Sequence, residues 1–203
     1  MKQINIKEYF KQEVEDLRQA TSDPDIEPPS LTIVDATDGD IGNQIYIKKK
    51  IEDFEALNWP VKLVKPADND NSLWHILENI DTSSVIVQMP VAERFNFCIN
   101  DIPNYLDCDG LTKDALVYPA TVRGILDYLD ACGFSYEGKT AVVLGRSEIV
   151  GKPMAQALLN RNMTVSVCHS KTPVEVLDYL LHSTDLVISA VGKPHFFSRK
   201  WCP

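Results

Sequence analysis

Apolar residues recur along the chain with two different periods, and the exchange between them predicts the architecture. Residues 6–20 carry apolar side chains three and four positions apart, which is typical of an amphipathic helix. Short, strongly apolar runs then alternate with helical patterns. The predicted strands are 31–36, 61–66 and 83–90, and the helices between them are 46–57 and 72–79. This alternation predicts a parallel sheet covered by helices on both faces.

The same alternation returns in the C-terminal part of the chain. Residues 90–118 are less regular, and a helix follows that begins after Pro119 and ends at Gly133, where helices favour these residues. The predicted strands are then 140–145, 164–169 and 185–192, and the helices are 151–160 and 173–181. We therefore predict an α/β fold of two units that flank a cleft. The first covers residues 1–136 and includes the linking helix, and the second covers residues 137–203.

The second unit opens with a strand–turn–helix motif, VVLGRSEIVGKPMAQALL. Gly145 ends the strand and Gly151 precedes a helix that carries Pro153 in its first turn. Glycine lets the backbone approach a pyrophosphate, and a helix N-terminus offers unpaired N–H groups to an anion. The pattern is not GxGxxG, so taken alone it is weak evidence, and a plain structural turn is then the default interpretation.

Two features strengthen the dinucleotide interpretation. Arg146 is a cation directly after the strand, and the next strand ends in CHSKT, where a mononucleotide-binding unit places the adenosine ribose. NAD sites usually carry an acidic residue at that point, whereas this chain has Ser170 and Lys171, which suit a 2′-phosphate. The second unit is thus predicted to be a Rossmann-like NAD(P)-binding domain that prefers NADP to NAD. Lys171 by itself is almost as well explained as a solvated loop residue.

Composition narrows the function further. The 203 residues carry a net charge of −9, which argues against nucleic acid or an anionic membrane surface as partner. No apolar stretch approaches the roughly 20 residues of a membrane span, and the polar N-terminus does not resemble a secretory signal. The five cysteines occur singly, which fits a reducing, cytoplasmic compartment. His75, His182 and His195 belong to no ligand pattern, so no metal site is predicted.

Several motifs, in order, resemble the bifunctional methylenetetrahydrofolate dehydrogenase/cyclohydrolase family. In the second unit these are GRSEIVGKP, TVSVCHSKT and DLVISAVGKP, and in the first they are IYIKKKIEDF, VIVQMPV, LDCDGL and PATVRGI. The resemblance runs from about Leu31 to the end of the chain. It implies NADP-dependent oxidation of 5,10-methylenetetrahydrofolate to the methenyl form, followed by hydrolysis to 10-formyltetrahydrofolate. It also implies a first domain that binds folate and a homodimer formed through the cofactor domain.

The resemblance assigns a role to each matching residue. Lys50 would assist hydrolysis of the methenyl bridge, and Gln88 would orient it. Tyr46, four residues before Lys50 and on the same helix face, would stack on the folate rings, and Asp109 would accept hydrogen bonds from the pterin. The cofactor-binding residues would be Gly145, Arg146, Ser147, Gly151, Pro153, His169, Ser170, Lys171 and Thr121.

Each of these residues also has an ordinary structural interpretation. Lys48, Lys49 and Lys50 form a charge run, which on a helix is usually a solvated face. Tyr46 would more often lie in a core or at its rim, and Gln88 is also a common polar residue at a strand end. Asp109 before Gly110 is equally a turn signal, and His169 is more often structural.

The chain also departs from the family pattern. Ala120 and Val122 stand where the family has cysteine and proline, and the segment LTKDALVY between Gly110 and Pro119 is short. The chain stops at RKWCP, where family members continue with another strand and a closing helix, so a sheet edge and an apolar surface are expected to lack cover. A fragmentary or non-catalytic relative that binds NADP or folate without turnover therefore remains the alternative.

Overall fold

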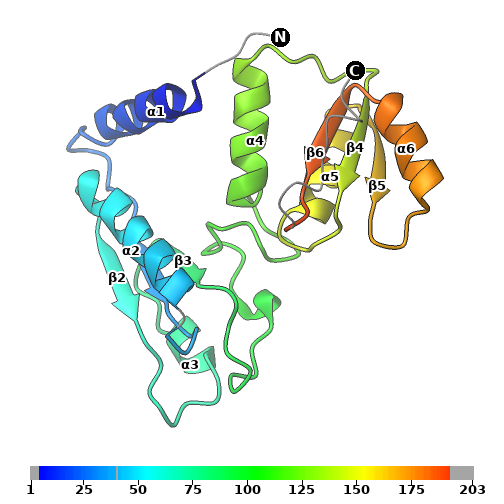
Figure 1. Ribbon diagram of the computed structural model, residues 1–203. Helices are drawn as coiled ribbons and strands as arrows, with labels where there is room; N and C mark the ends of the chain where they lie inside the picture. Colours follow the sequence, from blue (N-terminus) through cyan, green and yellow to red (C-terminus); the bar gives the residue numbers. More distant parts are fainter. Residues whose placement is uncertain (1–4, 40, 193–203) are drawn as a thin grey trace. The chain divides into compact units, whose positions relative to one another are not determined.

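The chain forms two compact units, each with its own parallel sheet. The computed structural model describes residues 5–39 and 41–192, and the units meet in the sequence between Val117 and Tyr118 (Figure 1). We call Asn5–Val117 the N-terminal unit and the described residues from Tyr118 onward the C-terminal unit. Both are built from strands that alternate with helices, so the predicted α/β class is confirmed.

In the N-terminal unit a central strand is flanked on both sides by strands that follow it in the sequence. The elements are α1 (Ile6–Ala20), β1 (Leu31–Val34), α2 (Ile41–Ala56), β2 (Val61–Val64), α3 (Trp74–Leu77), β3 (Ser84–Val87) and the 3-10 turn η1 (Ile99–Asp101). The sheet order is β2-β1-β3, all parallel, with Leu31 opposite both Val61 and Ser84. Because parallel strands end at one edge, the residues after β1 and β3 emerge side by side.

The central strand β1 is buried on both faces, as its continuous apolar sequence predicted. Leu31 and Ile33 pack with Ile47 of α2, whereas Val34 belongs to a second cluster with α3 and the segment after β3. Side chains alternate across a strand, so one short strand supplies both cores. The α2 cluster fixes the orientation of that helix and therefore of the residues on its other faces.

The C-terminal unit repeats this plan. Its elements are α4 (Ala120–Ala131), β4 (Thr140–Leu144), α5 (Gly151–Leu159), β5 (Thr164–Cys168), α6 (Val174–His182) and β6 (Leu186–Ser189). The described strands are parallel in the order β5-β4-β6. On one face of β4, Val143 packs against α5 and α4, and on the other, Val142 packs against α6.

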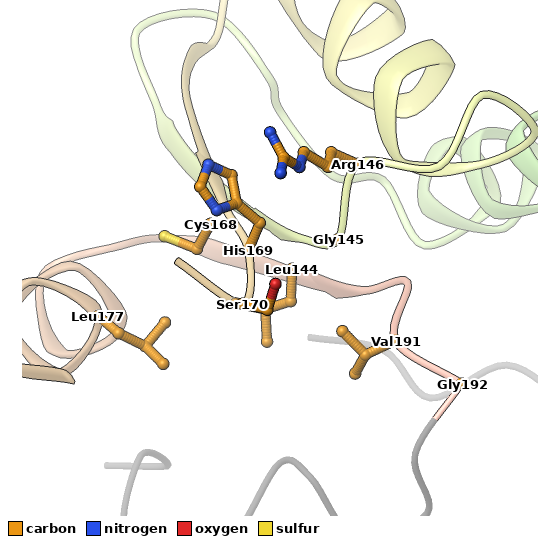
Figure 2. A pocket seen from close by; sticks show the side chains of 9 residues that line it. All are labelled: Leu144, Gly145, Arg146, Cys168, His169, Ser170, Leu177, Val191 and Gly192. Carbon is orange, nitrogen blue, oxygen red and sulfur yellow. The ribbon is translucent and has the colours of Figure 1, made fainter. Parts of the chain in front are cut away.

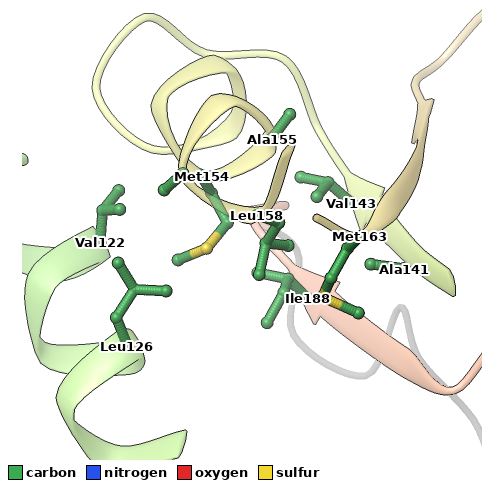
Figure 3. Packing of buried hydrophobic residues seen from close by; sticks show 10 residues of the cluster. Val122, Leu126, Ala141, Val143, Met154, Ala155, Leu158, Met163 and Ile188 are labelled. Atoms are coloured by element: carbon green, nitrogen blue, oxygen red, sulfur yellow. The ribbon is translucent and has the colours of Figure 1, made fainter. Parts of the chain in front are cut away.

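The helix that was predicted to link the units packs with the second of them. Val122 and Leu126 of α4 are fully buried against Met154 and Leu158 of α5 (Figure 3). This shared core places the boundary between the units at Tyr118, whereas the sequence predicted it after residue 136. The sequence showed that the helix is amphipathic but not which unit its apolar face contacts.

The predicted elements agree with the structure in kind and differ at their ends. Helix α2 begins at Ile41, five residues before its predicted start, because residues 41–45 are helical although they include a glycine and two polar residues. Helix α3 is limited to Trp74–Leu77, and each strand is shorter than its apolar run. The C-terminal sequence RKWCP lies outside the described residues. No helix within 5–39 and 41–192 has the length and apolar character needed to cross a membrane.

Candidate functional site

Three residues that are far apart in the sequence meet in the N-terminal unit. Lys50 Nζ on α2 donates to Gln88 Oε1 directly after β3, at 3.2 Å, and lies 3.7 Å from Asp109 Oδ2. The Lys50 side chain is 30% exposed and that of Asp109 is 25% exposed, while Gln88 is buried. The group is therefore partly shielded from water but accessible to a ligand. We call Lys50, Gln88 and Asp109 the lysine cluster.

The Gln88 amide is held so that its oxygen faces Lys50. Its Nε2 donates to the carbonyl of Met89 at 3.1 Å and to Asn43 Oδ1 at 3.4 Å. A backbone carbonyl can only accept, so the NH₂ end is fixed on that side and the oxygen is left for the ammonium group. Gln88 also precedes the cis peptide bond between Met89 and Pro90. Asn43, on the first turn of α2, was not singled out from the sequence.

Helix α2 places its three consecutive lysines in different environments. Lys48 and Lys49 pair with Glu52 and Asp53 one turn along, and their side chains are 77% and 70% exposed. These two are the solvated face that a charge run predicts, whereas Lys50 turns toward β3. Tyr46 lies one turn before Lys50 and is 66% exposed, so its ring is free of the core.

A buried carboxylate fixes the start of α2. Asp35, directly after β1, accepts hydrogen bonds from Gln44 Nε2 at 2.9 Å and Thr37 Oγ1 at 2.7 Å, and Lys65 Nζ lies 3.4 Å away. Burial by itself raises the pKa of Asp35, but the hydrogen bonds from Gln44 and Thr37 outweigh it and hold the pKa below its ordinary value. The charged form thus ties α2, which carries the lysine, to the sheet edge.

In the C-terminal unit the two motif glycines are required by close backbone contacts. Gly145 has φ +112°, and a Cβ there would lie 2.5 Å from the carbonyl oxygen of Ala190. A Cβ on Gly151 would lie 2.5 Å from the carbonyl oxygen of Gly145. Neither position accepts a side chain without a backbone shift, so the glycines bring the turn after β4 close to both α5 and the end of β6.

The start of helix α5 is held by Ser147, which lies in the turn before the helix. Ser147 Oγ accepts from the backbone N–H groups of Gly151 and Val150 at 3.2 and 3.3 Å. Pro153 is the third residue of the helix, where the missing N–H costs no intrahelical bond. Thr121 lies in the first turn of α4 and is exposed. The pocket described next is not lined by Thr121, Ser147 or Pro153.

A pocket of about 330 Å³ opens at the carboxyl ends of the strands of the C-terminal unit. Four of the predicted cofactor residues line it, namely Gly145, Arg146, His169 and Ser170. The sequence had not indicated the apolar part of the lining, which is made by Leu144, Cys168, Leu177, Val191 and Gly192. In Figure 2 the Arg146 and His169 side chains lie on the upper side of the view, and the apolar side chains of Leu177 and Val191 lie on the lower side. The pocket thus joins a cationic rim to an apolar wall.

The turn after β5 is closed by its own hydrogen bonds. The His169 N–H donates to Thr172 Oγ1 at 2.9 Å, the Thr172 N–H donates to the His169 carbonyl at 2.9 Å, and the Lys171 N–H donates to His169 Nδ1 at 3.2 Å. Ser170 and Lys171 lie at the tip of this turn and are exposed. Burial raises the pKa of the neighbouring Cys168 thiol, so that group remains a neutral part of the apolar wall.

Neither site has the composition of a metal centre. Within the part of the chain that the structure describes, no three His, Cys, Asp or Glu residues come together in a way that could hold an ion. The residues that the sequence did not indicate mostly hold the lysine cluster or its segments in place by hydrogen bonds, as Asn43, Asp35 and Asp107 do. Two of them could have been found from the sequence. Asn43 is three residues before Tyr46 on the same helix, and Asp107 lies inside the motif LDCDGL.

The C-terminal unit has the strand order and glycine turn of a Rossmann-like nucleotide-binding domain, and the N-terminal unit carries a lysine–amide–carboxylate cluster. Together they define a two-unit α/β protein of the NAD(P)-binding class. The family model for the tetrahydrofolate dehydrogenase/cyclohydrolase NAD(P)-binding domain matches residues 119–203. The bifunctional protein FolD of Clostridium novyi is 31% identical over 97% of this chain and 74% of its own length.

The chain belongs to the FolD family of bifunctional methylenetetrahydrofolate dehydrogenase/cyclohydrolases, as its motifs indicated. The crystal structure of FolD from Campylobacter jejuni has a TM-score of 0.81 at 28% identity, covering 94% of this chain and 73% of that one. The Trypanosoma brucei enzyme, complexed with NADP cofactor and an inhibitor, shares the fold with a TM-score of 0.79 at 24% identity, over 97% and 72% of the two chains.

Proposed function

We propose that this chain oxidises 5,10-methylenetetrahydrofolate to 5,10-methenyltetrahydrofolate with NADP and hydrolyses the product to 10-formyltetrahydrofolate. The observation that carries the proposal is the lysine cluster. Lys50, Gln88 and Asp109 come from a helix, a strand end and a loop, and they are the residues that the family resemblance selects for folate chemistry. Membership of the FolD family supplies the reaction class.

The cluster provides the groups that hydrolysis of a methenyl bridge requires. Lys50 is a hydrogen-bond donor held by Gln88 Oε1 at 3.2 Å, so its amino group has a defined position, which supports a role at the reacting bridge. In our proposal Lys50 assists attack of water on the methenyl carbon. Asp109 accepts hydrogen bonds from the pterin N–H groups, and Tyr46 offers its exposed ring for stacking.

The pocket of the C-terminal unit fits NADP. Arg146 and Ser170 are at its rim, and none of the described lining residues is acidic. A 2′-phosphate gains charge-assisted hydrogen bonds from such a rim, whereas the 2′-hydroxyl of NAD is usually held by a carboxylate. The exposed Lys171 adds charge at the tip of the same turn. The apolar wall of Leu144, Leu177 and Val191 suits an adenine ring.

The remaining predicted contacts involve the phosphate loop. Gly145, Gly151 and Pro153 shape the turn and the start of α5, and Ser147 holds that start together. Thr121 and His169 complete the proposed cofactor residues. When bound, NADP supplies the hydride acceptor for oxidation of the methylene carbon. The protein contributes binding, orientation and the exclusion of water.

The test is a spectrophotometric assay of methenyltetrahydrofolate formation from methylenetetrahydrofolate, run with NADP and NAD in parallel. We expect formation with NADP and a much lower kcat/KM with NAD. A folded sample that forms no methenyl product with either cofactor would contradict the dehydrogenase assignment. In that case a titration of NADP and of folate would identify a binding protein without turnover.

We further propose that the protein is cytoplasmic and acts as a homodimer formed through the C-terminal unit. The four described cysteines are unpaired, which fits a reducing compartment. The dimer is an expectation from the family resemblance. Light scattering coupled to size-exclusion chromatography measures the mass directly, and a mass near the 22.8 kDa of one chain would contradict the dimer.

A further inference from the structure

One buried carboxylate in the N-terminal unit has no role in the reaction as proposed. Asp107 is 4% exposed and lies two residues before Asp109. Its Oδ1 accepts from the Gly110 N–H at 2.9 Å, and its Oδ2 accepts from the Thr112 N–H at 2.7 Å and from Thr112 Oγ1 at 2.8 Å. Both oxygens are therefore used, and both bond to the loop that carries Asp109.

The other side of Asp107 is fixed to strand β3. The Val85 N–H donates to the Leu106 carbonyl at 2.8 Å, and Asp107 pairs with Val85 as an isolated parallel bridge. The Cys108 thiol donates to the Val85 carbonyl at 3.5 Å. Strand β3 ends at Val87, directly before Gln88. The two partners of Lys50 are thus linked, because β3 leads to Gln88 and also holds the base of the Asp109 loop.

The side chain of Asp107 forces this loop to turn back on itself. Its three hydrogen bonds span Asp107 to Thr112 and enclose Gly110, which has φ +67°. Asp109 lies within this closed segment, and its Oδ2 is 3.7 Å from Lys50 Nζ. Release of the segment would allow Asp109 to move while Lys50 and Gln88 keep their contact.

We propose that Asp107 is a positioning residue for the cyclohydrolase reaction, which sets the place of Asp109 relative to Lys50 without touching the substrate. This inference rests on the proposed function. The position of the folate contact then depends on the buried hydrogen bonds of Asp107 as well as on the Asp109 carboxylate. A misplacement of about 1 Å in such a group can lower a rate by about a hundredfold.

Asparagine at position 107 is the most informative replacement because it preserves shape but not hydrogen-bond capacity. Its single oxygen can serve either Gly110 or Thr112, and its NH₂ group would face an N–H donor on the other side. A matched control is Asp101→Asn. Asp101 also accepts a backbone bond, from the Cys98 N–H at 2.8 Å, but it belongs to the turn η1 and lies outside the segment Asp107–Thr112.

The experiment measures kcat and KM for methenyltetrahydrofolate hydrolysis in the wild type, Asp107→Asn, Asp101→Asn and Asp109→Asn, and in the Asp107→Asn/Asp109→Asn pair. We expect Asp107→Asn to lower kcat/KM by between about ten- and a hundredfold. We expect Asp101→Asn to leave it unchanged. If Asp107 acts through Asp109, introducing Asp107→Asn into the Asp109→Asn variant should lower kcat/KM by less than about a further twofold.

A purely structural role would give a different pattern. The losses of the two variants would then multiply in the pair, or Asp107→Asn would retain full activity, and either result overturns the inference. Thr112→Val serves where Asp107→Asn does not fold, because it removes only the hydroxyl bond to Oδ2. Its smaller loss must also vanish in the Asp109→Asn background. A wild type without hydrolysis, in contrast, contradicts the proposed function itself.

Discussion

Replacement of Lys50 by methionine tests whether this side chain serves the chemistry or the stability of the N-terminal unit. Methionine keeps an unbranched side chain of similar length but removes the charge and all three donors. Lys50 Nζ would lose its 3.2 Å contact to Gln88 and its 3.7 Å contact to Asp109. We expect Lys50→Met to abolish methenyltetrahydrofolate hydrolysis while the protein remains folded.

The two magnitudes follow from the structure. The ion pair is partly exposed and longer than an ideal contact, so its loss should change the free energy of unfolding by no more than about 1 kcal/mol, and loss of the hydrogen bond to Gln88 adds about 0.5–1.5 kcal/mol. A positioned acid–base group typically contributes about 10²- to 10⁴-fold to a rate, which corresponds to about 2.7–5.4 kcal/mol of activation free energy. The effect on the activation barrier should therefore exceed the effect on stability.

The assay follows the loss of methenyl absorbance, and a thermal melt of each sample reports folding. Lys49→Met is the matched control, because Lys49 is the preceding residue, is 70% exposed and pairs only weakly, at 3.3 Å, with Asp53. It should retain wild-type hydrolysis. Equal hydrolysis in Lys50→Met and the wild type would refute the role of Lys50. An equal loss in both lysine variants would show that net charge on α2, and not position, is what matters.

Three further predictions concern other parts of the chain. Arg146→Ala should weaken NADP by about tenfold or more and NAD much less, because a charge-assisted bond is worth about 1.5–3 kcal/mol; equal losses in titrations of both nucleotides would refute a 2′-phosphate contact. The pKa of Asp35 in the folded protein lies below its ordinary value of 3.8. The charged carboxylate therefore stabilises the fold above pH 3.8, and this contribution is lost as the pH falls through the lower pKa of the folded state. The difference in urea midpoint between the wild type and Asp35→Asn should be constant from pH 7 to pH 5 and should shrink below pH 3.8; a difference that does not depend on pH would contradict this assignment. The Cys108 residue is exposed, but desolvation of its thiol, which donates to the Val85 carbonyl, and the neighbouring Asp109 carboxylate raise the thiol pKa from 9.0 to about 11. Its alkylation at pH 8 should therefore be about a hundredfold slower than that of a thiol with a pKa of 9.0, and a normal rate by peptide mapping would argue against that environment.

The sequence by itself determined the element types and the family. The apolar runs of β1, β3 and β4 are enough to predict buried parallel strands, because a strand covered on both faces has no polar side. The motifs around Gly145 and Gly151 gave the position of the turn, since only glycine is accepted at backbone contacts this close. Element ends were less certain, as the early start of α2 shows.

Only the tertiary structure decided which residues meet. Three consecutive lysines are equivalent in sequence, and the burial of Ile47 against the sheet turns Lys50, and not Lys49, toward β3. The apolar face of helix α4 could pack against either unit as far as the sequence shows. Its packing against α5 assigns the helix to the C-terminal unit. Asp107 and Asp109 look alike along the chain, yet one is buried and bonds the backbone while the other faces Lys50. Contacts between distant segments depend on packing and on the direction of each strand end, and local periodicity carries no information about either.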